Sequence, residues 1–399
     1  MNIQNYVDIL LEQKEVICSS KDYGIHNGKS GLLLFLLCFG EVNEDYREEE
    51  IGKLITIIFE DLIVYVQHQI DLDSSNELSF CEGLAGIAWC IDTMRESNFL
   101  DLDGEYLIAF DSILLKYAEI LIKLDFWDPL YGLIGIGHYF IKREIKGGVL
   151  LILDFLTKNK NLFFEGSFFW RKNLDQDSDP NLKMVDLGVA HGNAGILLFL
   201  IKCHEKDLYK EISSPLIKDL CQFYNLTQQN DAEIQSLWKY FIYEDELKNN
   251  KISFQESRIG WCYGDLVILY ALYQAARILN DKDYENIILD KLILTGNRKS
   301  REQTNIENAY FCHGSAGLVS IFDQLFKISS RNEFKILREY WINDMNENYE
   351  RDGSQNLWLD KNYISVLNGS LGPNFVQLHV ENYQSIDYKS TILSQIFFL

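Results

Sequence analysis

Four side chains suited to binding metals or moving protons lie within two residues of a glycine at three separate places in the chain. They are His191, Cys262, Cys312 and His313. Two cysteine thiolates and one imidazole form a ligand set typical of zinc, and three ligands leave a fourth position for water or substrate, as in catalytic sites. The cysteines do not form a closely spaced pair, so their spacing alone is weak evidence for such a site. The chemistry therefore depends on an element that brings the three places together.

A glycine motif that occurs seven times supplies such an element. Each copy has a small or polar residue, a glycine, two further residues, usually a second glycine, and then an apolar run. Successive copies begin about 50 to 70 residues apart, which is room for two helices and their connections. The fifth copy has Val267 in place of the second glycine, and in the seventh copy Pro373 follows that glycine. The first glycines are Gly28, Gly83, Gly132, Gly192, Gly264, Gly314 and Gly369.

The segments around these glycines predict an all-α fold of helical hairpins. The runs after the glycines are apolar almost all round, as in helices buried on every side, whereas the intervening stretches are amphipathic at helical spacing. Only four prolines interrupt 399 residues, which favours long helices. The repeat leaves open whether the hairpins close into a ring or continue as an open solenoid. The amphipathic stretches are 44–70, 105–124, 205–226, 284–294 and 332–349.

Two aromatic-rich stretches do not fit the helical pattern. Residues 163–171 and 237–254 carry aromatic side chains between polar turns, and we expect minor short strands or ordered loops there. The second stretch precedes Cys262, so we expect it to cover the mouth of the site.

Alignment of the copies by their first glycine places the candidate residues on one rim of the fold. The glycines mark the N-terminal ends of the inner helices, where free backbone N–H groups and the helix dipole favour an anionic group. The slot two residues before the glycine holds His26, Cys81, Leu130, Ala190, Cys262, Cys312 and Leu367. The fourth, fifth and sixth copies together present His191, Cys262, Tyr263, Cys312 and His313. Cys81 lies in the distant second copy, and we interpret it as a packing or cavity residue.

The composition argues against several classes of function. The chain carries 37 basic and 59 acidic side chains, a net charge of -22, which disfavours nucleic-acid partners. The first residues lack the pattern of a signal peptide, and the longest apolar runs are too short for an integral membrane segment. We therefore expect a cytoplasmic protein with reduced cysteines, and leave peripheral membrane association open.

Three segments resemble the signature motifs of the lanthionine synthetase C family. They read DLGVAHGNAG at 186–195, RIGWCYGD at 258–265 and CHGSAG at 312–317, and the glycine copies extend the resemblance over nearly the whole chain. The resemblance implies an α/α toroid of seven inner and seven outer helices, formed by one domain over residues 1–399. It also implies a zinc ion (Zn2+) held by Cys262, Cys312 and His313.

The resemblance further marks His191 as the acid or base, with Asp128, Arg258 and Tyr263 as its partners in the pocket. Each residue also has a structural interpretation. Asp128 would make a good N-cap, Arg258 a solvated loop charge, and Tyr263 a rim aromatic packed against Trp261. His191 would then be a histidine satisfied at a helix start.

The function implied by the resemblance is that of a lanthipeptide cyclase. Such an enzyme adds peptide cysteine thiols to dehydroalanine or dehydrobutyrine and so forms lanthionine or methyllanthionine rings. Its substrate is a dehydrated precursor peptide, and a dehydratase is the expected partner because the length leaves no room for a fused dehydratase half.

Three other functions stay open at this point. The same site would suit the addition of glutathione or another small thiol to dehydroamino acids. A zinc-stabilised scaffold that only binds peptides would instead close the metal with a fourth protein ligand. Another zinc-bearing toroid, such as a prenyltransferase subunit, would replace one soft ligand by a carboxylate.

Overall fold

Helices make up most of the chain in the computed structural model. The structure describes residues 1–71, 78–101, 104–171, 183–230, 235–249, 251–356, 363–382 and 392–399. None of the helices in these ranges is both long and apolar enough to cross a membrane.

Seven inner helices begin at the glycine motifs. Six start directly after the first glycine of their copy and the seventh starts two residues after it, and nearly all of their side chains are buried. They are α3 (Lys29–Val42), α5 (Leu84–Glu96), α7 (Leu133–Lys142), α9 (Asn193–Glu205), α12 (Asp265–Ile278), α15 (Ser315–Ser329) and α17 (Leu371–Glu381). Pro373 is the third residue of α17, in the first turn, where the missing N–H costs no helical hydrogen bond.

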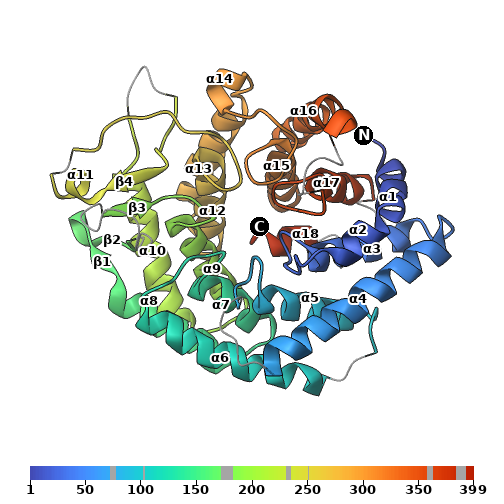
Figure 1. Cartoon of the computed structure of the whole chain (residues 1–399). Helices are drawn as coiled ribbons and strands as arrows, with labels where there is room; N and C mark the ends of the chain where they lie inside the picture. Colours follow the sequence, from blue (N-terminus) through green and yellow to red (C-terminus); the bar gives the residue numbers. More distant parts are fainter. Residues whose placement is uncertain are drawn as a thin grey trace.

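The inner helices close into a ring. Each one contacts the next along the chain, and α17 contacts α3, so the fold is a toroid and not an open solenoid (Figure 1). Six outer helices each pack on the inner helix before them: α4 (Glu48–Asp71), α6 (Ile108–Lys123), α8 (Lys146–Asn159), α10 (Lys210–Leu226), α13 (Lys282–Gly296) and α16 (Asn332–Asn356). The seventh outer position is taken by α1 (Ile3–Glu12), which contacts α17 and α4 and is followed by α2 (Lys14–Ser19). The predicted α/α toroid is confirmed, whereas the assignment of residues 1–399 to one domain stays a prediction.

Close approach of the backbone explains the glycine pattern. A Cβ atom on Gly195 would lie 2.4 Å from the carbonyl oxygen of Val189, so the first turn of α9 packs directly on the loop before it. In the fifth copy, where Val267 replaces the second glycine, the first glycine, Gly264, makes a close contact of its own. That residue has φ +100°, and a Cβ atom there would lie 1.6 Å from the carbonyl oxygen of Arg258. Only glycine fits this conformation and this contact.

Two small antiparallel sheets lie outside the ring. Strand β1 (Asn161–Leu162) pairs with β2 (Phe168–Phe169) around the 3-10 turn η2 (Phe164–Gly166), and β3 (Met184–Asp186) pairs with β4 (Phe241–Tyr243). Strand β4 leads into α11 (Glu244–Lys248). The predicted short strands near 163–171 and 237–254 are confirmed, but their partners β1 and β3 lie outside those stretches.

The remaining short helices are η1 (Gly104–Leu107), α14 (Arg301–Thr304) and α18 (Ile392–Ile396). The last of these lies at the centre of the ring, where the chain ends (Figure 1).

Candidate metal centre and active site

A circle of backbone hydrogen bonds joins the rim loops that precede the inner helices. Six of the seven residues two positions before the first glycine donate their N–H to the carbonyl oxygen of the equivalent residue in the next copy, over 2.9 to 3.4 Å. These bonds run from His26 to Cys81, Cys81 to Leu130, Ala190 to Cys262, Cys262 to Cys312, Cys312 to Leu367, and Leu367 to His26. The exception is Leu130, whose N–H donates instead to Asp128 Oδ1 over 2.9 Å.

The circle brings two cysteines and a histidine together just before α12 and α15. The donor atoms of Cys262, Cys312 and His313 all lie within 4.8 Å of one another. Cys262 is buried, whereas Cys312 and His313 are half-buried, so one side of the cluster faces the rim. In the ranges that the structure describes, no other group of three histidine, cysteine or acidic side chains is arranged to hold a metal ion.

The electrostatics of this cluster suit a soft divalent cation. Cys312 donates to the Cys262 sulfur, and this bond, helped by the charge of Arg258, lowers the pKa of Cys262 despite its burial. The same bond and burial raise the pKa of Cys312. Burial and Arg258 lower the pKa of His313, which favours the neutral imidazole that a metal needs. The two cysteines are held together by one shared S–H proton, and the imidazole beside them is neutral. A soft cation could bind all three donors by displacing that proton.

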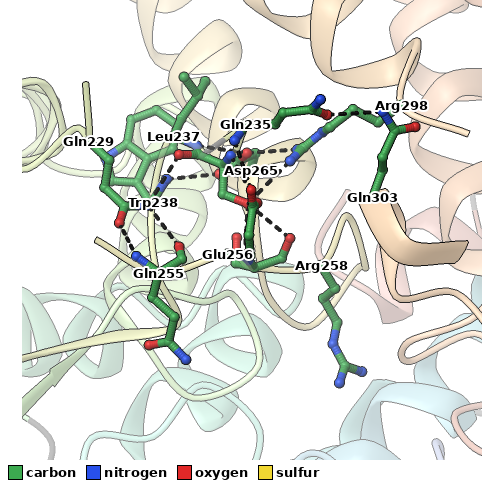
Figure 2. Close-up of polar contacts among 12 residues, drawn as sticks. Gln229, Gln235, Leu237, Trp238, Gln255, Glu256, Arg258, Asp265, Arg298 and Gln303 are labelled. Atoms are coloured by element: carbon green, nitrogen blue, oxygen red, sulfur yellow. Dashed lines mark hydrogen bonds and ion pairs between the residues drawn. The ribbon is translucent and has the colours of Figure 1, made fainter. Parts of the chain in front are cut away.

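Arg258 lies beside the cluster on a loop that is fixed by a buried network (Figure 2). Asp265, the first residue of α12, accepts the backbone N–H groups of residues 237 and 238 over 2.9 Å and pairs with Arg298 over 2.7 Å. Glu256 accepts from the Ser236 hydroxyl over 2.6 Å, which ties the Arg258 loop to the same segment. The Arg258 side chain points away from this network, and the positive charge of its guanidinium acts on both cysteines and on the histidine of the cluster.

His191 pairs with Asp128 on the neighbouring part of the rim. The His191 Nδ1 and Asp128 Oδ2 atoms are 2.8 Å apart, and Asp128 Oδ1 accepts the backbone N–H groups of Leu130 and Tyr131 over 2.9 Å each. Asp128 is therefore the partner of His191, but the prediction that it is an N-cap is wrong. The N-cap of α7 is Gly132, and Asp128 instead holds the turn at residues 130 and 131 that precedes the helix. Because a carboxylate can only accept, the imidazole carries its hydrogen on Nδ1 and leaves the Nε2 lone pair available.

Tyr263 is held by residues that the sequence reasoning missed. Its hydroxyl donates to Asp186 Oδ2 over 2.7 Å, and its ring meets Tyr240 edge-on with centroids 5.7 Å apart. Burial and Asp186 raise the pKa of Tyr263, so its proton stays committed to Asp186. Trp261, the expected packing partner, instead faces Phe311. Asp186 is the first residue of the DLGVAHGNAG segment, and its place in that motif is the one feature of the sequence that could have marked it as a site residue.

The rim brings the two halves of the site side by side. Ala190, the neighbour of His191, donates to the Cys262 carbonyl, and the charge of Asp128 contributes to the raised pKa of Tyr263. Cys81 is fully buried, as the packing interpretation requires. It interacts electrostatically with Cys312, so it lies nearer to the cluster than its place in a distant copy suggested.

Comparisons with known proteins agree with this architecture. The nisin biosynthesis protein NisC of Lactococcus lactis subsp. lactis is 26% identical over 351 residues, which cover 80% of this chain and 81% of that protein. A solved structure of nisin cyclase superposes with a TM-score of 0.77 at 22% identity, covering 99% of this chain and 97% of the other. A family model described as lanthionine synthetase C-like protein matches residues 19–391. The chain therefore belongs to the lanthionine synthetase C-like family.

Proposed function

We propose that this protein is a lanthipeptide cyclase that holds zinc through Cys262, Cys312 and His313. It joins a cysteine thiol of a dehydrated precursor peptide to a dehydroalanine or dehydrobutyrine of the same peptide. The observation that carries this proposal is an open cluster of three soft donors beside the His191–Asp128 pair on one rim. The two similar proteins, a nisin biosynthesis protein and a nisin cyclase, support the same reaction.

Zinc, when bound, supplies a positive charge that lowers the pKa of a neighbouring substrate thiol. The two cysteine ligands offset that charge, so a substrate sulfur at the rim stays electron-rich enough to attack. The half-buried position of Cys312 and His313 leaves the approach to the donors on the rim side.

His191 moves the proton in this mechanism. The substrate sulfur attacks the β-carbon of the dehydro residue, and the α-carbon then needs a proton. The S–H bond and the π bond between the α- and β-carbons are broken, and one C–S and one C–H bond are formed. The Nε2 atom can take the thiol proton and return it to the α-carbon. Asp128, bonded to Nδ1, holds the ring in this tautomer and stabilises the imidazolium that forms between the two transfers.

Arg258 and Tyr263 hold the substrate from two sides, the first at an oxygen and the second at a hydrogen-bond donor. The guanidinium stabilises the negative charge that develops on the enolate oxygen. Tyr263 donates its own hydrogen to Asp186, so its oxygen accepts a hydrogen bond from the substrate peptide and does not compete as a proton donor.

The substrate also identifies the reaction that comes before this one. Dehydroalanine and dehydrobutyrine arise from serine and threonine by loss of water, so we propose that a dehydratase supplies the peptide.

Ring formation on a dehydrated peptide tests the proposal. The purified protein is stripped of metal, restored with zinc, and supplied with the peptide and glutathione together. We expect ring formation without change in peptide mass, restored by about one equivalent of zinc. An adduct with glutathione would identify a small-thiol transferase instead, and zinc binding with no product of either kind would identify a scaffold.

A further inference from the structure

The last residues of the sequence pass through the centre of the ring. After α18 come Phe397, Phe398 and Leu399, whose exposed fractions are 0%, 1% and 5% (Figure 1). A closed ring of helices leaves a central space that side chains must fill, since an empty apolar cavity loses packing contacts. Here the filling comes from a segment that belongs to none of the seven hairpins.

One side of this segment touches the loops that carry the cysteines. The Phe397 ring stacks on Phe311 with centroids 3.5 Å apart and an interplanar angle of 12°. The Trp261 indole N–H donates to the Phe397 carbonyl over 3.0 Å, and its ring meets Phe397 edge-on at 5.0 Å. Trp261 directly precedes Cys262 and Phe311 directly precedes Cys312, so Phe397 lies against both cysteine-bearing loops.

The other side of the segment packs on different copies of the motif. The Phe398 ring stacks on His138 at 3.9 Å and meets Phe80 at 5.4 Å. His26 donates from Nε2 to the Ile396 carbonyl over 2.7 Å. No described contact of Phe398 reaches Trp261 or Phe311, although the two phenylalanines are equally buried.

We propose that Phe397 is a positioning residue for the metal centre, which sets the separation of the Cys262 and Cys312 loops from inside the ring. At the rim the loops are joined by the hydrogen bond from the Cys262 N–H to the Cys312 carbonyl over 3.1 Å, and the rings of Trp261 and Phe311 meet edge-on with centroids 5.8 Å apart. Phe397 lies against both of these rings. Its stack on Phe311 and the hydrogen bond that it accepts from Trp261 set how far apart the two loops, and so the two sulfur atoms, lie. This inference rests on the proposed metal site and not on the reaction.

The test compares Phe397→Ala with Phe398→Ala, which remove the same side chain from equally buried neighbouring positions. We expect both variants to lose comparable thermal stability in the metal-free form. Zinc affinity, measured by competition with a chelator, should fall about 10- to 100-fold in Phe397→Ala, as for other residues that orient metal ligands. It should change by less than about 3-fold in Phe398→Ala, a change smaller than such orienting residues produce.

A milder pair covers the case in which these variants do not fold. Phe397→Leu keeps an apolar side chain but loses the flat stack, and Trp261→Phe keeps an aromatic ring but loses the hydrogen bond to the Phe397 carbonyl and part of the packing of the indole. In cobalt-substituted protein both should alter the thiolate-to-cobalt absorption, whereas Phe398→Leu should leave it unchanged. Equal zinc affinities, or spectra altered equally by changes at 397 and 398, would overturn the inference. A wild-type protein that binds zinc tightly but closes no ring would contradict the proposed function alone.

Discussion

Asp128 shows how one side chain links the fold to the proposed chemistry. Six equivalent backbone N–H groups continue the hydrogen-bonded circle, but that of Leu130 turns to Asp128 Oδ1. The circle is therefore interrupted at the place where Asp128 Oδ2 reaches His191. Its two oxygens are fixed by different partners, so the carboxylate has no freedom to rotate, and the His191 ring is held in one tautomer.

The role of His191 as acid and base predicts the behaviour of His191→Ala. The variant should keep its zinc, because the residue is not among the three clustered donors, and should lose about 10²- to 10⁴-fold in ring formation. Metal analysis and single-turnover assays on a dehydrated peptide measure the two effects. His204→Ala, at the far end of α9, is the matched control. A His191 variant that loses its metal would show that this histidine is a ligand.

The cluster itself predicts that Cys312→Ala loses zinc and ring formation but keeps its helices. Ionisation of the substrate thiol by zinc explains only about 30-fold of the expected loss in ring formation, since a free cysteine thiol of pKa about 8.5 is already partly ionised at neutral pH. The remainder of the loss reflects the placement of the substrate sulfur beside the double bond of the dehydro residue. Zinc content, far-ultraviolet circular dichroism and ring formation are compared with those of Cys221→Ala, a buried cysteine on α10. Loss of helix in the Cys312 variant alone would make the metal structural.

At the scale of elements, each inner helix is positioned by the close packing of its first turn on the preceding loop. That contact places the loop, and with it the candidate site residue, at a fixed height on the rim. The β3–β4 sheet adds a second layer on one side of the site. Asp186, at the end of β3, holds the hydroxyl of Tyr263, and Tyr240, just before β4, packs on the ring of Tyr263.

Two glycine-to-alanine changes test this packing. In Gly195→Ala the new methyl group would lie 2.4 Å from the Val189 carbonyl and 2.5 Å from Pro129, so we expect a loss of about 1 to 3 kcal/mol in the free energy of unfolding. In Gly52→Ala the methyl group on α4 meets nothing within 4 Å, and alanine should stabilise the helix by about 0.5 to 1 kcal/mol. Urea unfolding measures both changes. Equal effects would contradict the packing explanation.

At the scale of the whole molecule, the ring encloses two buried histidines that stay neutral. Burial lowers the pKa of His26 from 6.5 to about 4, and burial together with Lys202 lowers that of His138 to about 3. The unfolded chain binds protons at both residues below pH 6.5, whereas the folded chain does not. The stability that these histidines contribute is therefore complete above that pH and is lost as the pH falls toward 4.

The variant His138→Phe isolates this effect. It removes a buried ring nitrogen that has no hydrogen-bond partner among the described residues and keeps a flat ring against Phe398. Between pH 4 and 6 the free energy of unfolding should fall less steeply than in the wild type, by about 1.4 kcal/mol per pH unit. Denaturant titrations at several pH values give the two slopes. Parallel slopes would mean that His138 is protonated inside the ring.

The sequence by itself determined where the inner helices begin and which residues lie on the rim. Glycines and apolar runs act locally, so residues such as Cys262 and His313 could be aligned without knowledge of the fold. Helix α8 was not among the predicted amphipathic stretches, because Gly147 and Gly148 lower the helix propensity of its first turn.

Only the tertiary structure decided that the ring closes, that Asp128 meets His191, and that Phe397 lies beneath the cysteine loops. Asp128 and His191 are 63 residues apart, and the local sequence around Asp128 suggested a helix cap, which the structure does not form. The contact of α17 with α3 joins opposite ends of the chain, and it depends on the small rotation between successive hairpins. That rotation comes from the packing of whole helices against one another, which no single segment of the sequence contains.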